Sequence, residues 1–301
     1  MTEKVLLVDI DSKIPNLALM KVASYYRGQG AVVGFNIPDP DKVYASVIFK
    51  PNAHRVDGLR VFYPNADIDI GGSGYSLTKE LPPEIESQSP DYSIYPSCDS
   101  YIGFTTRGCI RKCYFCIVNR KEGGFRRIYD SGKEALDHII GSYAGRFDRI
   151  TFLDNNILAD KDWFFQITDE LIRRNLKCDF KSGLDVRLLD SEIAERLSIL
   201  HPFKPWKFAY DDKSVLPWVS KGIDLLRDVG IDLKHNVEFY VYCHGQEQVR
   251  DAIDRCRYLK ENGVTAYSMC NMDRPLTPDM KKLKRWTRPM IFWTIDYEEY
   301  A

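Results

Sequence analysis

Three cysteines fall close together in this 301-residue chain, as Cys109, Cys113 and Cys116 in the pattern C-x3-C-x2-C. The apolar stretch from Tyr101 to Phe104 precedes them and predicts a strand, and the pair Gly123-Gly124 follows. Thiolates this close in sequence can surround one soft metal centre, because a loop that folds back on itself points its sulfurs inward. Structural zinc usually takes four ligands from paired C-x2-C units, and no second pair stands nearby. Three cysteines on a four-iron cluster would leave one iron open to a small molecule.

This loop resembles the cluster loop of the radical S-adenosylmethionine enzymes. The resemblance rests on the three cysteines, on aromatic Phe115 before the last of them, and on the context Thr106-Arg-Gly-Cys109. It implies that Cys109, Cys113 and Cys116 are catalytic ligands of a 4Fe-4S cluster whose open iron chelates S-adenosylmethionine. An electron then yields a 5′-deoxyadenosyl radical that abstracts hydrogen. The wider context is similar to the subgroup with an N-terminal cobalamin-binding-like domain. A partial zinc site or a chance grouping is the alternative.

The resemblance also implies where S-adenosylmethionine binds. Phe115 would pack near the adenine. Family members carry G-G-E after the second strand to hold the amino group, and this chain has Asp154-Asn155-Asn156 after Phe152-Leu153. A carboxylate and amides at a strand end accept hydrogen bonds from an ammonium just as well. The alternative for Asp154 is a helix cap or a turn residue.

Three polar residues, Ser182, Asp185 and Arg187, follow the next predicted strand. Arg187 is a candidate bidentate partner for the carboxylate of S-adenosylmethionine, and Ser182 or Asp185 is a candidate partner for the ribose hydroxyls. A surface ion pair at a loop is the competing interpretation. Tyr210 and Asp211 end the strand after that one, and we expect them to face the substrate.

Basic side chains crowd the cysteine loop. They are Arg107, Arg111, Lys112, Arg120, Lys121, Arg126 and Arg127. An anionic thiolate cluster gains from nearby positive charge, which also tunes its reduction potential. Binding of an acidic substrate is the competing explanation. His244, after the fifth strand of this half, is also expected near the substrate, although a lone loop histidine is more often structural.

The composition is that of a globular protein with no global attraction to nucleic acid or membrane. Apolar residues make up 44% and charged residues 28%, and the net charge is −1. No apolar run of about 18 residues exists, and the first one, Val5–Val8, is too short for a signal peptide. We expect a cytoplasmic protein, where clustered cysteines suggest metal. We also expect a reducing partner such as flavodoxin or ferredoxin and an unidentified substrate.

Residues 1–95 predict an open α/β sheet of Rossmann type. The predicted strands are Val5–Val8, Ala31–Phe35, Tyr44–Phe49, Arg60–Tyr63 and Asp67–Ile70. A helix is predicted over Asn16–Arg27. The last strand runs into Gly71-Gly72-Ser-Gly74, which we interpret as a tight turn rather than a ligand loop.

This half resembles, with departures, the cobalamin-binding domains that precede many radical enzymes. Their signature is D-x-H-x-x-G, then S-x-L, then G-G. Here the first segment runs from Asp9 to Asn16 without the histidine or the glycine, whereas Ser46-Val-Ile48 and Gly71-Gly72 fall roughly where the later parts would. Without the histidine the usual lower axial cobalt ligand is missing. We therefore expect a degenerate domain and do not favour cobalamin as a cofactor.

From residue 101 to about 270 the sequence repeats a strand followed by a helix. The six predicted strands begin at Tyr101, Arg149, Asp179, Trp206, Val237 and Thr265. This rhythm predicts a partial (β/α)6 TIM-type barrel, in which ligands sit at the carboxyl ends of the strands. We predict three units, a Rossmann-like domain over 1–95, the barrel over 96–273 and an extension over 274–301. Met280, Leu283 and Trp286 make one apolar side, so we expect this extension to pack on the barrel rather than to bind nucleic acid.

We interpret the chain as a radical S-adenosylmethionine enzyme whose substrate is unknown. The outcome of hydrogen abstraction could be methylation, rearrangement, oxidation or cyclisation. A cobalamin-dependent radical S-adenosylmethionine methyltransferase is the first alternative, and a non-catalytic iron–sulfur or zinc binding protein is the second. Methylthiotransfer is largely excluded, because it needs a second cluster bound by N-terminal cysteines and none precedes Cys98.

Overall fold

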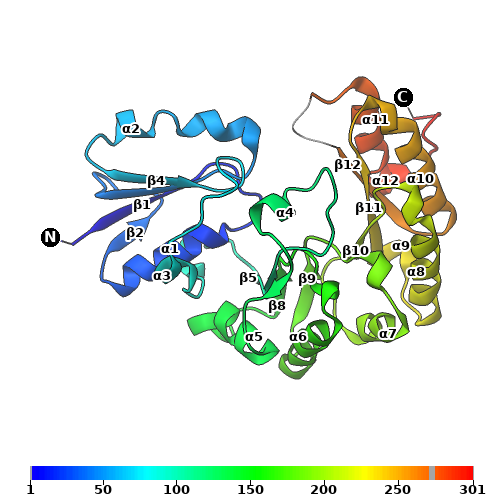
Figure 1. The fold of residues 1–301 in the computed structure, drawn as a ribbon, viewed down its shortest axis with the longest axis horizontal. Coiled ribbons are helices and arrows are strands. Elements are labelled where there is room, and N and C mark those ends of the chain that lie inside the picture. The colour runs from blue at the N-terminus through cyan, green and yellow to red at the C-terminus, as the bar shows by residue number, and fades with distance from the viewer. Residues whose placement is uncertain (1, 271–274, 301) are drawn as a thin grey trace.

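The computed structural model describes residues 2–270 and 275–300. Two groups of parallel strands lie beside each other with helices around them, the N-terminal group in blue and cyan and the other in green to orange (Figure 1). The predicted boundary between residues 273 and 274 lies outside the described residues. The division into three units stays a prediction.

The N-terminal sheet has four parallel strands in the order β2-β1-β3-β4. They are β1 (Lys4–Asp9), β2 (Val32–Gly34), β3 (Lys42–Ser46) and β4 (Asp67–Gly71). Its helices are α1 (Leu17–Gly28), η1 (Lys50–Val56), α2 (Leu59–Phe62), α3 (Pro83–Glu86) and η2 (Tyr92–Ile94). Asp9 lies opposite Ser46, and Ser46 lies opposite Gly71. The carboxyl ends of β1, β3 and β4 are therefore level.

The strand predicted over residues 60–63 is wrong, because residues 60–62 belong to helix α2 and Tyr63 follows its last turn. Val56 and Leu59 are buried, whereas Val61 and Phe62 are 80% and 75% exposed. The two buried residues contribute to a small core on one face of the sheet. A short apolar run does not separate helix from strand, and here the exposed half of the run gave the misleading signal.

The second group has six parallel strands in two sheets, ordered β5-β8-β9 and β10-β11-β12. They are β5 (Tyr101–Gly103), β8 (Arg149–Phe152), β9 (Lys177–Phe180), β10 (Trp206–Ala209), β11 (Val237–Cys243) and β12 (Thr265–Cys270). The short pair β6 (Thr106–Arg107) and β7 (Arg126–Arg127) is antiparallel. Leu184 forms a parallel bridge with Phe208 that links the two sheets. The six predicted strands and their parallel α/β order are confirmed.

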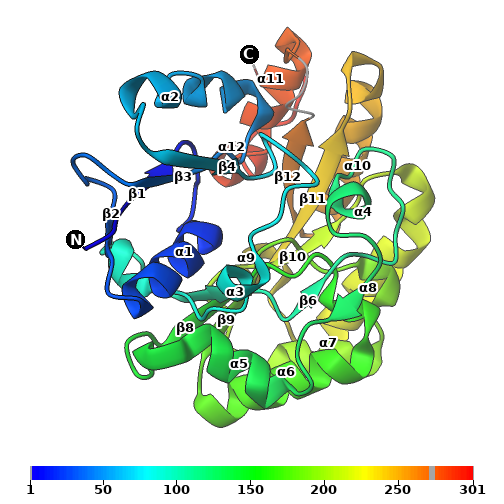
Figure 2. The same cartoon turned by 60° about the vertical axis from the view of Figure 1, so that its left-hand side comes forward.

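Helices follow the strands as predicted, and α5, α6 and α7 lie in a row outside them (Figure 2). The α-helices are α4 (Val118–Lys121), α5 (Gly132–Ile140), α6 (Lys161–Arg174), α7 (Ser191–Ile199), α8 (Leu216–Asp228), α9 (Leu233–Asn236), α10 (Val249–Glu261), α11 (Pro278–Trp286) and α12 (Pro289–Phe292). Short 3-10 turns are η3 (Gly141–Tyr143), η4 (Ile157–Ala159), η5 (Val186–Leu188), η6 (Lys213–Val215) and η7 (Gln246–Gln248). Ser131 and Asp190 cap α5 and α7, as their positions predict.

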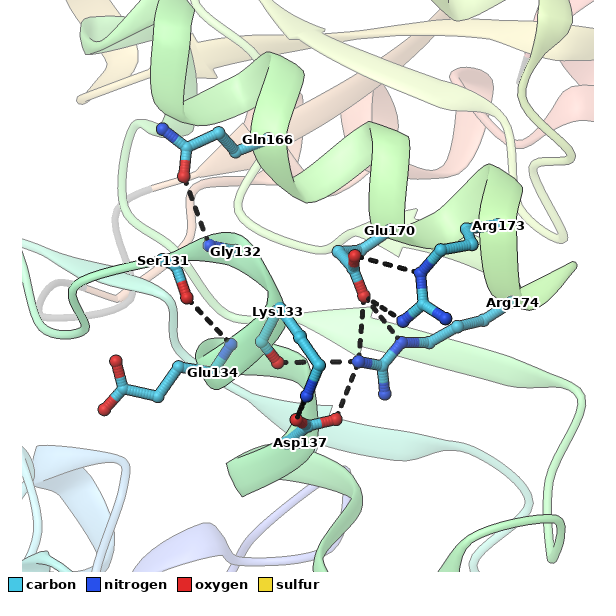
Figure 3. A network of polar contacts seen from close by, with 9 residues as sticks. All are labelled: Ser131, Gly132, Lys133, Glu134, Asp137, Gln166, Glu170, Arg173 and Arg174. Carbon is cyan, nitrogen blue, oxygen red and sulfur yellow. Dashed lines mark hydrogen bonds and ion pairs between the residues drawn. The ribbon is translucent and has the colours of Figure 1, made fainter.

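A polar network fixes α5 against α6 (Figure 3). Arg174 donates to Asp137 at 2.7 Å and to Glu170 at 2.9 Å, which joins the two helices at one end. At the other end, the Gly132 N–H donates to the Gln166 side chain at 3.3 Å. A Cβ on Gly132 would lie 2.8 Å from the Gln166 backbone, so the close approach depends on glycine.

One large apolar core contains buried residues of both groups of strands. Tyr92, in the connector between α3 and β5, is fully buried, and its hydroxyl donates to the Ile139 carbonyl at 2.7 Å and accepts from the Ile102 N–H at 3.0 Å. The apolar side predicted for the C-terminal helix is confirmed, because Met280, Leu283 and Trp286 are all buried in α11. Within the described residues, no helix is long and apolar enough to cross a membrane.

Candidate functional site

The loop between β5 and α5 carries the three predicted metal ligands, and the pairing of β6 with β7 brings its two ends together. Gly108 is required at this neck, because its φ is +78° and a Cβ would lie 2.1 Å from the carbonyl oxygen of Gly124. The Cys109 N–H donates to the Gly123 carbonyl at 3.4 Å. The glycine pair that follows the cysteines in sequence thus packs directly against the start of the loop.

The three cysteines lie on this loop as free, half-buried thiols. The Cys116 N–H donates to the Cys113 carbonyl at 3.1 Å, which turns the chain between them. Burial raises the pKa of Cys113 and Cys116, and the charge of Arg187 opposes the shift at Cys113. Within residues 2–270 and 275–300, no group of three or more His, Cys, Asp or Glu side chains is gathered closely enough to hold a metal ion. Convergence of Cys109, Cys113 and Cys116 on one metal centre stays a prediction.

Asp154 is a buried anchor for the start of the loop. Its Oδ1 accepts hydrogen bonds from the backbone N–H and the hydroxyl of both Thr105 and Thr106, at 2.6–3.1 Å. Trp163 donates to the Thr105 hydroxyl at 3.0 Å and extends the network into α6. Burial raises the pKa of Asp154, and these hydrogen bonds oppose the shift. The contacts are those of a turn residue, the alternative weighed from the sequence.

The next two residues continue this anchor along the loop. Asn155 accepts a hydrogen bond from the Gly108 N–H at 3.0 Å. The Asn156 amide donates to the Cys109 sulfur at 3.5 Å and to the Asp185 carboxylate at 3.4 Å. Asp154 and Asn155 therefore hold the backbone that leads to the first cysteine, and Asn156 contacts the sulfur of that cysteine.

Asn156 also carries an unpaired acceptor. Asn156 is 4% exposed, and its Oδ1 is the one buried side-chain polar atom without a hydrogen-bond partner in the described part of the chain. A buried acceptor left unpaired costs about 1–3 kcal/mol. An acceptor of this kind, beside the Cys109 sulfur, fits a ligand that donates a hydrogen bond, such as an ammonium group.

Asp185 and Arg187 meet beside the loop, whereas Ser182 does not join them. Arg111 and Arg187 each donate from Nε to the Asp185 carboxylate at 2.7 Å. Burial works to raise the pKa of Asp185, but the hydrogen bonds and charges of the two arginines outweigh it and hold the pKa below its usual value. The Ser182 hydroxyl is exposed and donates to the Leu153 carbonyl at 3.2 Å.

Asp211, at the carboxyl end of β10, faces the same region. Burial raises its pKa to about 6, while the charges of Arg255 and Arg187 oppose the shift. Its charge acts in turn on the thiols of Cys113 and Cys116. A half-buried carboxyl group near the cysteines is thus poised to change protonation close to neutral pH.

An aromatic contact joins the loop to β11. Phe115 stacks on Tyr242 with ring centroids 4.1 Å apart, and Tyr114 meets His244 edge-on at 5.6 Å. Gln248 donates to the Tyr114 hydroxyl at 3.3 Å. Sequence reasoning missed Tyr242, although alternation along β11 places it on the accessible face at the carboxyl end of the strand.

Several basic side chains of the loop pair with carboxylates. Arg107 contacts Glu86 at 3.0 Å and Glu122 at 3.3 Å, and Arg127 contacts Asp160 at 2.7 Å. Glu86 lies on α3, so Arg107 ties the neck of the cysteine loop to the N-terminal part of the chain. These ion pairs neutralise part of the positive charge that surrounds the thiols.

The glycine turn after β4 packs against the chain itself. Gly72 has a φ of +93°, and a Cβ there would lie 2.2 Å from the Val47 carbonyl oxygen. A Cβ on Gly74 would lie 2.6 Å from the Phe49 backbone. These glycines therefore allow close packing of two backbone segments, in agreement with the tight-turn interpretation.

Polar side chains at the same edge also pair within the chain. Asp11 accepts hydrogen bonds from the Ile48 N–H at 2.7 Å and the Phe49 N–H at 3.0 Å. The Tyr95 hydroxyl donates to Asp9 at 2.7 Å. None of these side chains is an imidazole, so the segment from Asp9 onward does not supply the usual nitrogen ligand for cobalt.

Comparison with known proteins finds a solved structure with a similar fold. No protein-family model matches the chain, and no curated protein matches it. Among solved structures, it is similar to the radical S-adenosylmethionine methyltransferase TsrM from Kitasatospora setae, determined with cobalamin and a 4Fe-4S cluster bound. The TM-score is 0.67 at 13% identity, over 90% of this chain and 75% of that chain. The protein thus shares its fold with this solved structure.

Proposed function

We propose that the protein is a radical S-adenosylmethionine enzyme that acts on a substrate still to be identified. One observation carries the proposal, namely that a loop with three thiols follows the first strand of a parallel sheet and an unpaired buried acceptor, Asn156 Oδ1, lies beside the first thiol. The carboxyl end of a parallel sheet is where such folds bind ligands. The shared fold supports the same conclusion.

The donor atoms of the loop are of the type that an iron–sulfur cluster requires, and the three thiols would draw together around it. Cys109, Cys113 and Cys116 supply three soft thiolate ligands, and their half-buried setting limits access of water to a bound cluster. When bound and reduced, such a cluster supplies the electron that cleaves S-adenosylmethionine to methionine and a 5′-deoxyadenosyl radical for hydrogen abstraction. A flavodoxin or ferredoxin in the cytoplasm is the proposed electron donor.

Other side chains would hold S-adenosylmethionine. Asn156 Oδ1 would accept a hydrogen bond from its ammonium group. Arg187 uses Nε on Asp185, and its terminal nitrogens remain suited to the carboxylate of the ligand. Phe115 and Tyr242 form an aromatic pair that would flank the adenine. Asp154 and Asn155 would act through the loop rather than on the ligand.

The same proposal includes the finer architecture. We infer a Rossmann-like domain over 1–95, a partial (β/α)6 barrel of TIM type over 96–273, and a C-terminal extension from 274. The bridge between Leu184 and Phe208 supports a single curved sheet of six strands. The parallel order of the N-terminal strands supports the first domain.

Cobalamin has no step in this proposal. The segment from Asp9 to Asn16 contains no histidine to act as the usual cobalt ligand, and Gly72 and Gly74 pack on the chain's own backbone. Cobalamin bound without a protein ligand would change the outcome to methyl transfer, the reaction named for the structural neighbour. Titration of the purified protein with hydroxocobalamin, followed by its visible spectrum, separates these outcomes.

Anaerobic turnover tests the proposal. The chain is reconstituted with iron and sulfide, reduced, and mixed with S-adenosylmethionine, and 5′-deoxyadenosine is measured. We expect product from wild type and from Cys98→Ala, a matched control in which a buried cysteine outside the loop is removed. Cys113→Ala should yield none. A zinc-loaded or clusterless wild type that yields no product would favour a non-catalytic metal-binding protein instead.

A further inference from the structure

Two cysteines outside the cluster loop end adjacent strands. Cys243 is the last residue of β11 and Cys270 the last residue of β12, and the two are direct partners in the parallel register. Both are free thiols. Strands that pair in this way run about 4.8 Å apart, so the two side chains leave the sheet next to each other.

Both thiols point to the helix-covered side of the sheet. Cys243 is 0% and Cys270 is 7% exposed, and alternate residues of the two strands lie on the opposite, more accessible side. The Cys243 thiol donates to the Gly245 carbonyl at 3.4 Å, and the Ser268 hydroxyl lies 3.8 Å from the Cys270 sulfur. The neighbouring Cys243 thiol and the Ser268 hydroxyl favour the Cys270 thiolate, so the pKa of Cys270 is lowered, while the pKa of Cys243 is raised. Cys270 is therefore the better nucleophile of the pair.

We propose that Cys243 and Cys270 form a reversible dithiol–disulfide pair with a low-molecular-weight disulfide as oxidant. The separation of paired strands falls within the Cα distances of disulfides, roughly 4.4–6.8 Å. The Cys270 thiolate attacks the oxidant and releases one thiol, and the Cys243 thiol then displaces the second. The protein pair loses two electrons and two protons, and the oxidant is reduced to two thiols.

The position of the pair connects it to the cysteine loop. Cys243 stands in the chain between Tyr242, which stacks on Phe115, and His244, which meets Tyr114. A bond from Cys243 to Cys270 draws the carboxyl end of β11 toward β12. Oxidation therefore loosens the aromatic contacts that hold the loop against β11.

β12 is an edge strand of its three-stranded sheet. An oxidant would reach the buried pair when the end of this strand opens. The carboxyl end of an edge strand opens more readily than an interior strand, which exposes Cys270 first. Cys178, by contrast, lies on β9, between strand β8 and the segment at Pro202. It is fully buried, and burial raises its pKa well above the usual value.

Disulfide mapping tests this inference without S-adenosylmethionine, so its failure is separate from failure of the proposed enzyme activity. The full chain, purified without oxygen, is incubated with oxidised glutathione, quenched with N-ethylmaleimide and digested for mass spectrometry. We expect a peptide pair joined through Cys243 and Cys270 that dithiothreitol separates. Hydrogen exchange of residues 109–116 should be faster in the oxidised form.

Variants make the result specific. Cys256→Ser, a buried cysteine in the neighbouring helix α10, should keep the crosslink. Cys243→Ser should leave Cys270 as a mixed disulfide with glutathione. Recovery of both residues as maleimide adducts would overturn the inference. Modification of Cys178 to the same extent would also overturn it, because oxidation would then follow unfolding.

Discussion

Two carboxyl edges of parallel sheets differ in what their polar side chains contact. At the N-terminal sheet, Asp11 accepts hydrogen bonds from the backbone of Ile48 and Phe49 after β3, and Asp9 accepts one from Tyr95. At the edge of β5-β8-β9, Asn156 keeps an unpaired oxygen. Half-buried thiols stand beside it.

The difference shows that the carboxyl edge of a parallel sheet can either support the fold or bind a ligand. Both edges could receive a ligand, because parallel sheets expose their loops there. The N-terminal edge is filled by backbone packed on Gly72 and by the connector residue Tyr95, so it serves as a support. At the second edge, the buried Oδ1 of Asn156 has no hydrogen-bond donor within the described chain.

The largest effect is expected at Asp154, which organises the second edge. In Asp154→Asn, an amide N–H replaces one acceptor and meets donors from Thr105 and Thr106. We expect a loss of about 2–4 kcal/mol in the free energy of unfolding, together with loss of iron binding. Urea unfolding and iron content measure the two effects, and exposed Asp148→Asn is the control. Wild-type values in Asp154→Asn would show that the loop holds its shape without this anchor.

A backbone substitution at the first edge should separate stability from metal binding. Gly72→Ala places a Cβ 2.2 Å from the Val47 carbonyl oxygen at a positive φ, so we expect a loss of about 2–3 kcal/mol. Gly71→Ala is matched, because a Cβ there meets no atom within 4 Å. Iron binding should be normal in both variants. Loss of iron in Gly72→Ala at a temperature where the protein is folded would contradict the division of roles.

The protonation of Asp211 gives a pH-dependent difference at the second edge. Its pKa is about 6 in the folded chain against 3.8 for the free side chain, so the folded state holds the proton more tightly. Its contribution to folding is complete below pH 3.8 and is lost as pH rises through 6, by about 3 kcal/mol. Asp211→Asn should therefore gain stability relative to wild type as pH rises from 4 to 7. A constant difference in urea midpoints across this range would refute the assignment.

The smallest effect is expected from Tyr95→Phe at the first edge. The change removes the hydroxyl that donates to Asp9 at 2.7 Å and keeps the ring on Phe35. We expect a loss of about 1 kcal/mol in the free energy of unfolding, because Asp9 also accepts from the Ser12 N–H. Thermal unfolding of Tyr95→Phe and wild type measures this loss of stability. A gain in cobalamin binding by this variant would mean that Tyr95 closes a working cofactor site.

Much of the architecture could be predicted from local patterns. The run from Val5 to Val8 and the alternation in β11 identify strands because side-chain periodicity is a local property. Residues 60–63 were misassigned because Val61 and Phe62 face solvent in a helix. The cysteine loop was recognisable because its three cysteines are neighbours in sequence.

Contacts made across the sheet were beyond sequence reasoning. Asp154 was expected on S-adenosylmethionine, yet its carboxylate holds Thr105 and Thr106, since the partner of a buried carboxylate depends on where the preceding loop folds. The pairing of Cys243 with Cys270 depends on strand register, which a single sequence does not specify.

The most direct test of the account is the electron paramagnetic resonance spectrum of the anaerobically reconstituted and reduced protein. The account predicts one 4Fe-4S signal per chain that shifts when S-adenosylmethionine is added. The signal should be absent in Cys109→Ala, Cys113→Ala and Cys116→Ala and unchanged in Cys98→Ala. A cluster signal that survives loss of Cys113, or a wild-type protein that binds zinc and no iron, would contradict the assignment of the loop as the cluster site.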